Sequence, residues 1–304
     1  QDLMGVEMRG ERPVVTVGIP FLNPGLFLLD AVRSVFAQSL SSWELILMDD
    51  GSDDGSYHLC MKIKDPRVRV FRDGKQMGLA ARLNQIASVA SGKYLARMDA
   101  DDLMHPERLA RQVALLEAHP EIAVVSTGYY LMDPEGNLLG VRMGVQPKPE
   151  EVFAWGGYLH ASIMARTSWF RDNPYALDYP RAEDRELFAR VMGQAQFFVL
   201  REPLYIYRWY GNTALTKLIR GYRSERRIIL RYGPSKLGWP KTWILLGRSL
   251  AKEAIVRAVS LFGQEEKVPR AIASLHATVA EEHRIEFEKT LRALRSVEVP
   301  GWGI

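Results

Sequence analysis

Three carboxylates crowd together at Asp99, Asp101 and Asp102, directly after the apolar run Tyr94–Met98. Like charges this close repel one another and raise one another's pKa unless a cation neutralises them. Mg²⁺ and Mn²⁺ prefer oxygen ligands, and Mg²⁺ usually binds one or two carboxylates together with phosphate oxygens. The cluster therefore predicts either a divalent-cation site that also takes phosphate, or a solvated loop that caps a helix expected from Pro106.

A second acidic group, Asp49-Asp50-Gly51-Ser52, follows the apolar run Glu44–Met48. Asp-Gly is a strong turn dipeptide, so this group by itself favours a turn. Ligands of parallel α/β sheets bind beyond the carboxyl ends of the strands. Two acidic strand ends on one sheet therefore favour a shared ligand site more than either does alone.

The elements that would position these groups alternate between short apolar runs and amphipathic stretches. We expect strands at 14–19, 44–48, 68–71, 94–98 and 123–126, and helices at 26–38, 55–64, 78–90 and 106–118. Such alternation implies an α/β fold with a doubly wound, mostly parallel sheet.

The second half of the chain is less regular. We expect a hairpin turn at 133–137, a loop at 144–150, a strand at 158–165, a helix at 182–192, and strands at 197–200 and 204–209. From residue 213 onward the pattern predicts only helices, broken at Gly233-Pro234, at Gly238-Trp239-Pro240 and at Pro269.

The composition is that of an ordinary globular protein. The 304 residues are 47% hydrophobic and 25% charged, which argues against disorder, collagen and a disulfide scaffold. The lone cysteine, Cys60, favours a reducing compartment. No apolar run approaches the roughly 20 residues of a membrane span, and the polar residues 1–12 do not resemble a secretion signal. A cytoplasmic location is therefore expected.

Positive charge is concentrated near the end of the chain. The net charge is +4, yet residues 213–257 hold 11 basic and 2 acidic residues, together with Trp239 and Trp243. Tryptophan with lysine and arginine suits a membrane–water interface. The alternative is that these helices pack on the rest of the protein with their charges outside. Nucleic acid is not an expected partner, because the remainder of the chain is acidic and holds no recognition motif.

Residues 14–210, roughly two thirds of the chain, resemble glycosyltransferase family 2, whose members are inverting nucleotide-sugar enzymes of the GT-A fold. The resemblance rests on ordered segments: Val15–Asn23, Ser34–Ser39 with Trp43–Leu45, Asp49–Ser52, Gly78–Asn84, Gly92–Tyr94, Asp99–Asp102, His160–Met164, and Glu183-Asp184 before Leu187-Phe188. It implies a GT-A catalytic domain over 13–210, between an N-terminal tail at 1–12 and a basic helical C-terminal region at 211–304.

The resemblance also implies a donor site at the strand ends. The residues it assigns to the nucleotide-sugar are Pro20, Phe21, Asn23, Asp50, Arg82, Asp99 and Arg208. Asp50 would bind the base or the ribose, Asp99 the ribose hydroxyls and Arg208 the diphosphate. Asp101, or alternatively Asp102, would ligate Mn²⁺ or Mg²⁺, which as a Lewis acid would stabilise the diphosphate leaving group.

Asp184 is the expected catalytic base. By resemblance it would accept the proton of the acceptor hydroxyl, and one carboxylate suffices when a metal ion assists the leaving group. The alternative is that Glu183 and Asp184 only favour the start of a helix. For His160 we expect a structural role.

Two segments depart from the family pattern. Leu22 stands where an aromatic residue is common, so stacking on the nucleotide base is lost or supplied elsewhere. A Tyr-Arg-x-His segment is replaced by Tyr207-Arg208-Trp209-Tyr210, and tyrosine is a poor substitute for a histidine metal ligand.

The sequence therefore predicts an inverting, metal-dependent glycosyltransferase. We expect a UDP-sugar donor and a glycan or lipid-linked acceptor, in the synthesis of a bacterial surface polysaccharide or glycoconjugate. Peripheral contact with an anionic membrane at the inner face of the plasma membrane is the accompanying hypothesis. The alternatives are a nucleotidyltransferase, which would need a Gly-rich phosphate loop after the first strand, and a non-catalytic nucleotide-sugar-binding relative.

Overall fold

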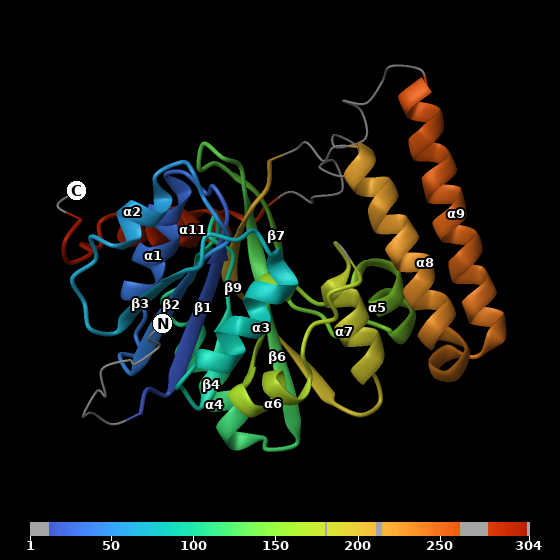
Figure 1. Ribbon diagram of the computed structural model, residues 1–304, viewed down its shortest axis with the longest axis horizontal. Helices are drawn as coiled ribbons and strands as arrows, with labels where there is room; N and C mark the ends of the chain where they lie inside the picture. The colour runs from blue at the N-terminus through green and yellow to red at the C-terminus, as the bar shows by residue number, and fades with distance from the viewer. Residues whose placement is uncertain (1–11, 180, 211–214, 262–278, 303–304) are drawn as a thin grey trace.

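A mixed β-sheet forms the centre of the computed structural model, which describes residues 12–179, 181–210, 215–261 and 279–302. The strands are ordered β3-β2-β1-β4-β8-β6-β9-β5, and β7 pairs with β6 (Figure 1). Their bounds are β1 Val15–Phe21, β2 Trp43–Asp49, β3 Val68–Arg72, β4 Tyr94–Arg97, β5 Leu103–Met104, β6 Ile122–Met132, β7 Leu138–Arg142, β8 Met164–Arg166 and β9 Gln196–Arg208.

The first four strands form the parallel half of the sheet. β1 lies between β2 and β4 and is parallel to both, and β3 continues the parallel order beyond β2. Every residue of β1 and β2 is buried, as expected for parallel strands covered on both faces. The shared direction brings the end of β2 at Asp49 and the loop after β4 to one edge of the sheet. The predicted α/β fold with a mostly parallel sheet is confirmed.

Helices connect these strands and cover the sheet. Their bounds are α1 Phe27–Phe36, α2 Ser56–Cys60, α3 Leu79–Val89, α4 Arg108–Ala118, α5 Pro149–Trp155, η1 His160–Ser162 (a 3-10 turn), α6 Thr167–Asp172, α7 Glu183–Val191, α8 Leu215–Leu237, α9 Trp239–Leu261 and α11 Glu281–Arg295. The main core, which includes Val17, Leu45 and Tyr94, joins the parallel strands to helices α1, α2 and α4, whereas α3 packs in a second cluster.

Three of the expected elements differ in the structure. The segment 158–165 is not one strand but η1 followed by the short β8, because the Ser162 hydroxyl donates to the Leu159 carbonyl and favours a tight turn. The strands expected at 197–200 and 204–209 form one continuous strand, β9. It stays paired with β6 in parallel across the expected break, where the register of the pairing shifts near Tyr129.

The break expected at Gly233-Pro234 is also absent, because α8 continues through Pro234 to Leu237. Pro234 has no backbone N–H, so the helix loses the hydrogen bond to the carbonyl of Leu230. Leu230 is exposed, and water can bind its carbonyl instead. The chain turns instead at Gly238, whose φ of +81° favours glycine. The break expected at Pro269 lies outside the described residues.

The C-terminal third of the chain packs in two places. α8 and α9 form a helical pair, and Ile228, Ile229 and Leu245 share a core with Phe153 of α5 and Ala189 of α7. α11 instead lies beside α1 and β7 on the opposite part of the molecule (Figure 1). The expected division at residue 210 stays a prediction. None of the described helices is long and apolar enough to cross a bilayer.

The last described residues return to the main core. Trp302 is 8% exposed, and its indole Nε1 donates to the Leu59 carbonyl at 2.8 Å. Val299 packs in the same cluster as the strands of the parallel half. The end of the chain is therefore part of the body that carries the acidic strand ends.

We predict that Trp302→Ala lowers the free energy of unfolding by about 3 kcal/mol, because a large buried ring and one hydrogen bond are lost. Urea denaturation monitored by circular dichroism measures the change. The matched control is Trp243→Ala, where the side chain is 62% exposed and the change should stay below about 0.5 kcal/mol. Equal losses in the two variants would contradict this packing.

Candidate active site

Two cavities meet at Asp99. The first, of about 380 Å³, lies at the end of β1, and we name it the β1 cavity; it is lined by Pro20, Phe21, Leu22, Asn23, Pro24, Phe27, Asp99, Ala100, Asp101 and Tyr210. The second, of about 600 Å³, lies at the start of α7, and we name it the α7 cavity; its lining includes Arg97, Asp99, Tyr129, Arg142, Trp155, Tyr158, His160, Glu183, Asp184 and Tyr207. Asp99 lines both cavities, so the two are adjacent.

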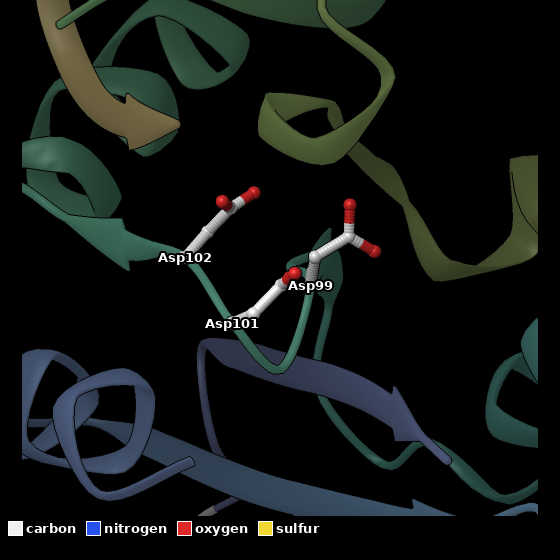
Figure 2. Close-up of side chains that lie close together, drawn as sticks. All are labelled: Asp99, Asp101 and Asp102. Carbon is white, nitrogen blue, oxygen red and sulfur yellow. The ribbon is translucent and has the colours of Figure 1, made fainter. Parts of the chain in front are cut away.

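The three carboxylates of the acidic loop present oxygens within 4.8 Å of one another (Figure 2). Asp99 is held by Arg97, whose guanidinium forms ion pairs at 2.6 and 3.0 Å with the two carboxylate oxygens. Asp101 accepts one hydrogen bond, from the Tyr210 hydroxyl at 2.9 Å, and lines the β1 cavity. Burial, together with the charge of Asp99, raises the pKa of Asp101.

Asp102 differs because it is fully buried. Its two oxygens accept from the Arg208 backbone N–H at 2.7 Å and from the Tyr205 hydroxyl at 2.9 Å. Burial and the neighbouring Asp101 raise its pKa well above the ordinary value. A cluster of hard oxygen ligands fits Mg²⁺ or Mn²⁺. Of the two predicted ligands, the contacts favour Asp101, because Asp102 is already bonded within the protein.

Arg208, which the resemblance assigns to the diphosphate, is buried behind the acidic loop. Its side chain is 0% exposed and lines neither cavity, and a contact with the diphosphate stays a prediction. The guanidinium donates to the Asp101 carbonyl at 2.7 Å, to the Pro134 carbonyl at 3.2 Å and to Asp30 at 3.1 Å, and it lies over the Phe27 ring. A buried cation needs such partners, so Arg208 serves to hold the acidic loop.

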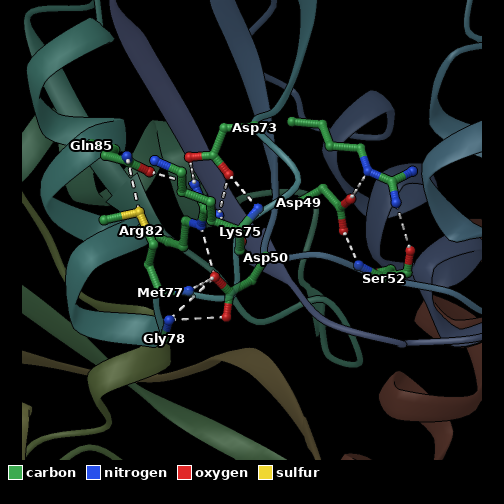
Figure 3. Close-up of polar contacts among 10 residues, drawn as sticks. Asp49, Asp50, Ser52, Asp73, Lys75, Met77, Gly78, Arg82 and Gln85 are labelled. Atoms are coloured by element: carbon green, nitrogen blue, oxygen red, sulfur yellow. Dashed lines mark hydrogen bonds and ion pairs between the residues drawn. The ribbon is translucent and has the colours of Figure 1, made fainter.

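Asp50 and Arg82 are brought together, but outside both cavities (Figure 3). Asp50 accepts from the backbone N–H groups of Met77 and Gly78 at 2.7 and 3.0 Å, and from Arg82 Nε at 2.8 Å. Arg82 also pairs with Asp73 at 2.7 Å, and this hydrogen bond lowers the pKa of Asp73. The network fixes the loop before α3 against the turn after β2.

The turn expected at Asp49–Ser52 is present and joined to the end of β1. Asp49 accepts from the Ser52 backbone N–H at 2.9 Å, and Ser52 Oγ accepts from the Asn23 N–H at 3.0 Å. Pro20, Phe21 and Asn23 line the β1 cavity as expected. The predicted donor residues Pro20, Phe21, Asn23 and Asp99 therefore share one cavity with Asp101.

Glu183 and Asp184 open α7 and face the α7 cavity. Asp184 Oδ1 accepts from the Arg185 backbone N–H at 2.8 Å, which fixes the carboxylate at the helix start. Burial, and secondly the charge of Asp184, raise the pKa of Glu183 to about 7. The two residues begin a helix, as one of the two interpretations expects, and they also line a cavity, while the role of Asp184 as a base stays a prediction.

His160 is buried and lines the α7 cavity. Its Nε2 lies 2.8 Å from the Tyr175 hydroxyl, and burial, together with the charge of Arg97, lowers its pKa well below the ordinary value. This agrees with the structural role expected from the sequence.

Sequence reasoning missed several lining residues. Arg97 lies two positions before Asp99, so strand alternation could have placed a cation beside the acidic loop. No sequence signal marked Trp155, which is 48% exposed at the α7 cavity, or the tyrosines 129 and 158, whereas Tyr207 opens a segment that was compared with the family pattern. The contribution of these residues depends on β6, β9, α5 and the loop after α5 meeting in space.

Comparison with known proteins identifies related sequences. The model of the family described as "Glycosyl transferase family 2" matches residues 16–172. The Bacillus subtilis (strain 168) protein named "Putative glycosyltransferase EpsE" is 34% identical over 256 residues, which cover 81% of this chain and 91% of that protein.

Solved structures share the fold at low identity. S. aureus TarS 1-349 in complex with UDP has a TM-score of 0.61 at 17% identity, covering 93% of this chain and 90% of that one. Mannosyltransferase PcManGT from Pyrobaculum calidifontis, in complex with GDP-Man and Mn²⁺, has a TM-score of 0.57 at 16% identity, covering 93% and 86%. At this identity the likeness shows the fold, which is GT-A.

The raised pKa of Glu183 predicts a pH-dependent stability. The unfolded side chain loses its proton near pH 4.5 and the folded one near pH 7, so stability falls as the pH rises through this window. Glu183→Gln should therefore raise the melting temperature relative to the unmodified protein at pH 8 and lose that advantage below about pH 4.5. Calorimetry at pH 4, 6 and 8 tests this. A difference that does not change with pH would contradict it.

Proposed function

This chain belongs to glycosyl transferase family 2 and is a glycosyltransferase, and we propose that it is inverting and metal-dependent and uses a UDP-linked sugar. The observation that carries the proposal is the junction of the two cavities at Asp99, with Asp101 in one and Asp184 in the other. A donor in the β1 cavity and an acceptor in the α7 cavity would meet there. Inversion by direct displacement is compatible with this arrangement, in which the nucleophile would approach opposite the departing diphosphate.

The β1 cavity would hold the nucleotide diphosphate. Pro20, Phe21 and Asn23 line it at the end of β1, and Asp99, which Arg97 holds, would accept hydrogen bonds from the ribose hydroxyls. Asp50 lines neither cavity, so it would act through the loop that it holds before α3.

Asp101, with Asp102 behind it, would hold Mn²⁺ or Mg²⁺. The bound ion would supply Lewis-acid stabilisation of the diphosphate leaving group. Arg208 keeps the loop in place from below by binding the Asp101 carbonyl. Tyr210 donates a hydrogen bond to the Asp101 carboxylate. This contact would orient the carboxylate, and Tyr210 itself would not ligate the metal ion.

Asp184 would accept the acceptor's proton in the α7 cavity. It stands at the first turn of α7 with one oxygen already fixed by a backbone N–H, which leaves the other to meet a hydroxyl. The aromatic lining by Tyr129, Trp155 and Tyr158 suits the apolar faces of sugar rings. We therefore propose a glycan or lipid-linked acceptor, in the synthesis of a surface polysaccharide or glycoconjugate.

The proposed place of action is the cytoplasmic face of an anionic membrane, with peripheral contact. The concentration of 11 basic residues in 213–257 supports it. Of the two alternatives, a nucleotidyltransferase is not supported by the family, and a non-catalytic relative is tested by the variants below.

We predict that UDP binding depends on both a divalent cation and Asp101. Asp101→Asn should weaken UDP binding in Mn²⁺ by at least about tenfold, because a charged ligand is replaced by a neutral one. Titration calorimetry with Mn²⁺ and with chelator provides the measurement. Equal affinity in chelator would reject metal dependence. If Asp102→Asn abolishes metal-dependent binding and Asp101→Asn does not, the ligand is the other carboxylate of the same site.

We predict that Asp184→Asn lowers kcat by at least about a hundredfold while leaving UDP binding nearly unchanged, because the variant keeps the shape but cannot accept the proton. Turnover of a UDP-sugar with an acceptor extract, followed by UDP release, measures it. Glu183→Gln is the matched neighbour and should retain most activity. Loss of turnover in Glu183→Gln alone would move the base by one residue, and full activity in both variants would place the base elsewhere.

A further inference from the structure

One side of α9 is apolar and exposed over most of the helix. It carries Trp239, Trp243, Ile244, Gly247, Leu250, Ala251, Ala254, Ile255 and Ala258, which we name the α9 face. The five largest of these side chains are 54–63% exposed. The other side of the helix holds the buried residues Thr242, Leu245, Leu246, Ser249, Glu253 and Val256. α8 thus covers half of the helix, and Figure 1 shows α9 on the outer side of α8.

The side chains at the edges of the α9 face are basic, and two of the three form ion pairs: Arg257 with Glu253 and Lys241 with Glu150. Arg257 lies along one edge of the apolar side, and Arg248 and Lys241 along the other, as 3.6 residues per turn require. Arg248 is exposed and has no ion pair among the described residues. The one acidic residue of α9, Glu253, faces inward, where it pairs with Arg226 at 2.6 Å and Arg257 at 2.7 Å. The outer side of this helix, as far as the structure describes it, therefore presents no negative charge.

We propose that the α9 face binds the surface of an anionic lipid bilayer, with the helix lying in the headgroup region. A large exposed apolar strip on a monomer marks an interaction surface. A helix with tryptophans at one end, an apolar strip along its length and Arg248 exposed at the edge of that strip matches a bilayer interface, where apolar side chains enter and a cationic side chain extends to the headgroups. The Trp239 and Trp243 rings stack at 6.1 Å and form a single aromatic anchor.

This surface is physically connected to the α7 cavity. Lys241 of α9 pairs with Glu150 of α5, and Lys252 donates to the Ala154 carbonyl of the same short helix. The next residue of α5, Trp155, lines the α7 cavity. Membrane contact through the α9 face would therefore hold α5 near the bilayer. On the basis of the proposed function, we infer that the acceptor is a lipid-linked sugar, because such an acceptor is confined to the bilayer surface that the α9 face would bind.

Vesicle co-sedimentation of the full chain tests the surface. Phosphatidylcholine vesicles with about 30% phosphatidylglycerol should bind the protein at low salt, and pure phosphatidylcholine vesicles should bind it at least about tenfold more weakly. The face variant Trp243→Glu, Leu250→Glu, Ile255→Glu should lose at least about tenfold in partitioning. The matched control Met61→Glu, Leu177→Glu, Ile285→Glu replaces three exposed apolar residues elsewhere and changes the net charge by the same amount. Its partitioning into vesicles should fall less than that of the face variant, by the effect of the added negative charge alone.

Each contrary outcome overturns the proposal. Absence of binding to anionic vesicles at low salt rejects it, and an equal loss in the control variant shows that only net charge matters. If the face variant converts a dimer to a monomer in sedimentation equilibrium without changing vesicle binding, the occupant is a second copy of the chain. Because no step needs turnover, Asp184→Asn should bind vesicles normally, so failure of the proposed function and failure of this surface remain distinguishable.

Discussion

The concentration of negative charge after β4 is the constraint on which the rest of the site depends. Three carboxylates within 4.8 Å cannot all stay ionised in a partly buried loop without compensation. The protein compensates two of them from within: Arg97 pairs with Asp99, while a backbone N–H and the Tyr205 hydroxyl bind Asp102. Asp101 receives a single hydroxyl and faces a cavity. One carboxylate is thereby left to bind an external cation, and its two neighbours fix its position.

Buried arginines make that arrangement rigid. Arg108 donates to the Arg97 carbonyl at 2.8 Å and lies over the Tyr205 ring, and burial lowers its pKa to about 10. Arg208 binds the Asp101 carbonyl and reaches Asp30 of α1. Removing one partner of a buried charged group is costly, so these contacts persist or fail together. The acidic loop is therefore positioned by β9, α4 and α1, although the loop itself is short.

The sequence predicted best where a single physical rule decides the outcome. The strands 15–21 and 43–49 are buried on both faces, so their apolar runs located them almost to the residue. The single strand expected over 158–165 was wrong, because the Ser162 hydroxyl competes there for the backbone. Arg208 was expected at a diphosphate from the family resemblance, and its contacts join it to Pro134 and Asp30, which lie 74 and 178 residues away. No local pattern can reveal such contacts. The sequence showed that the helices after residue 213 are basic, but which side of α9 stays exposed depends on its packing against α8.

The C-terminal third of the chain contacts the rest of the molecule in two separate places, and ion pairs contribute to both contacts. Arg295 at the end of α11 reaches Asp30 at 3.3 Å, the same carboxylate that receives Arg208. One acidic side chain thus joins the end of the chain to the support of the acidic loop. α8 and α9, by contrast, place Arg185, Glu225 and Lys252 in contact beside the start of α7. Segments that follow the sheet in sequence therefore contact the supports of both cavities, so the surroundings of Asp99 include α8, α9 and α11 as well as the strands.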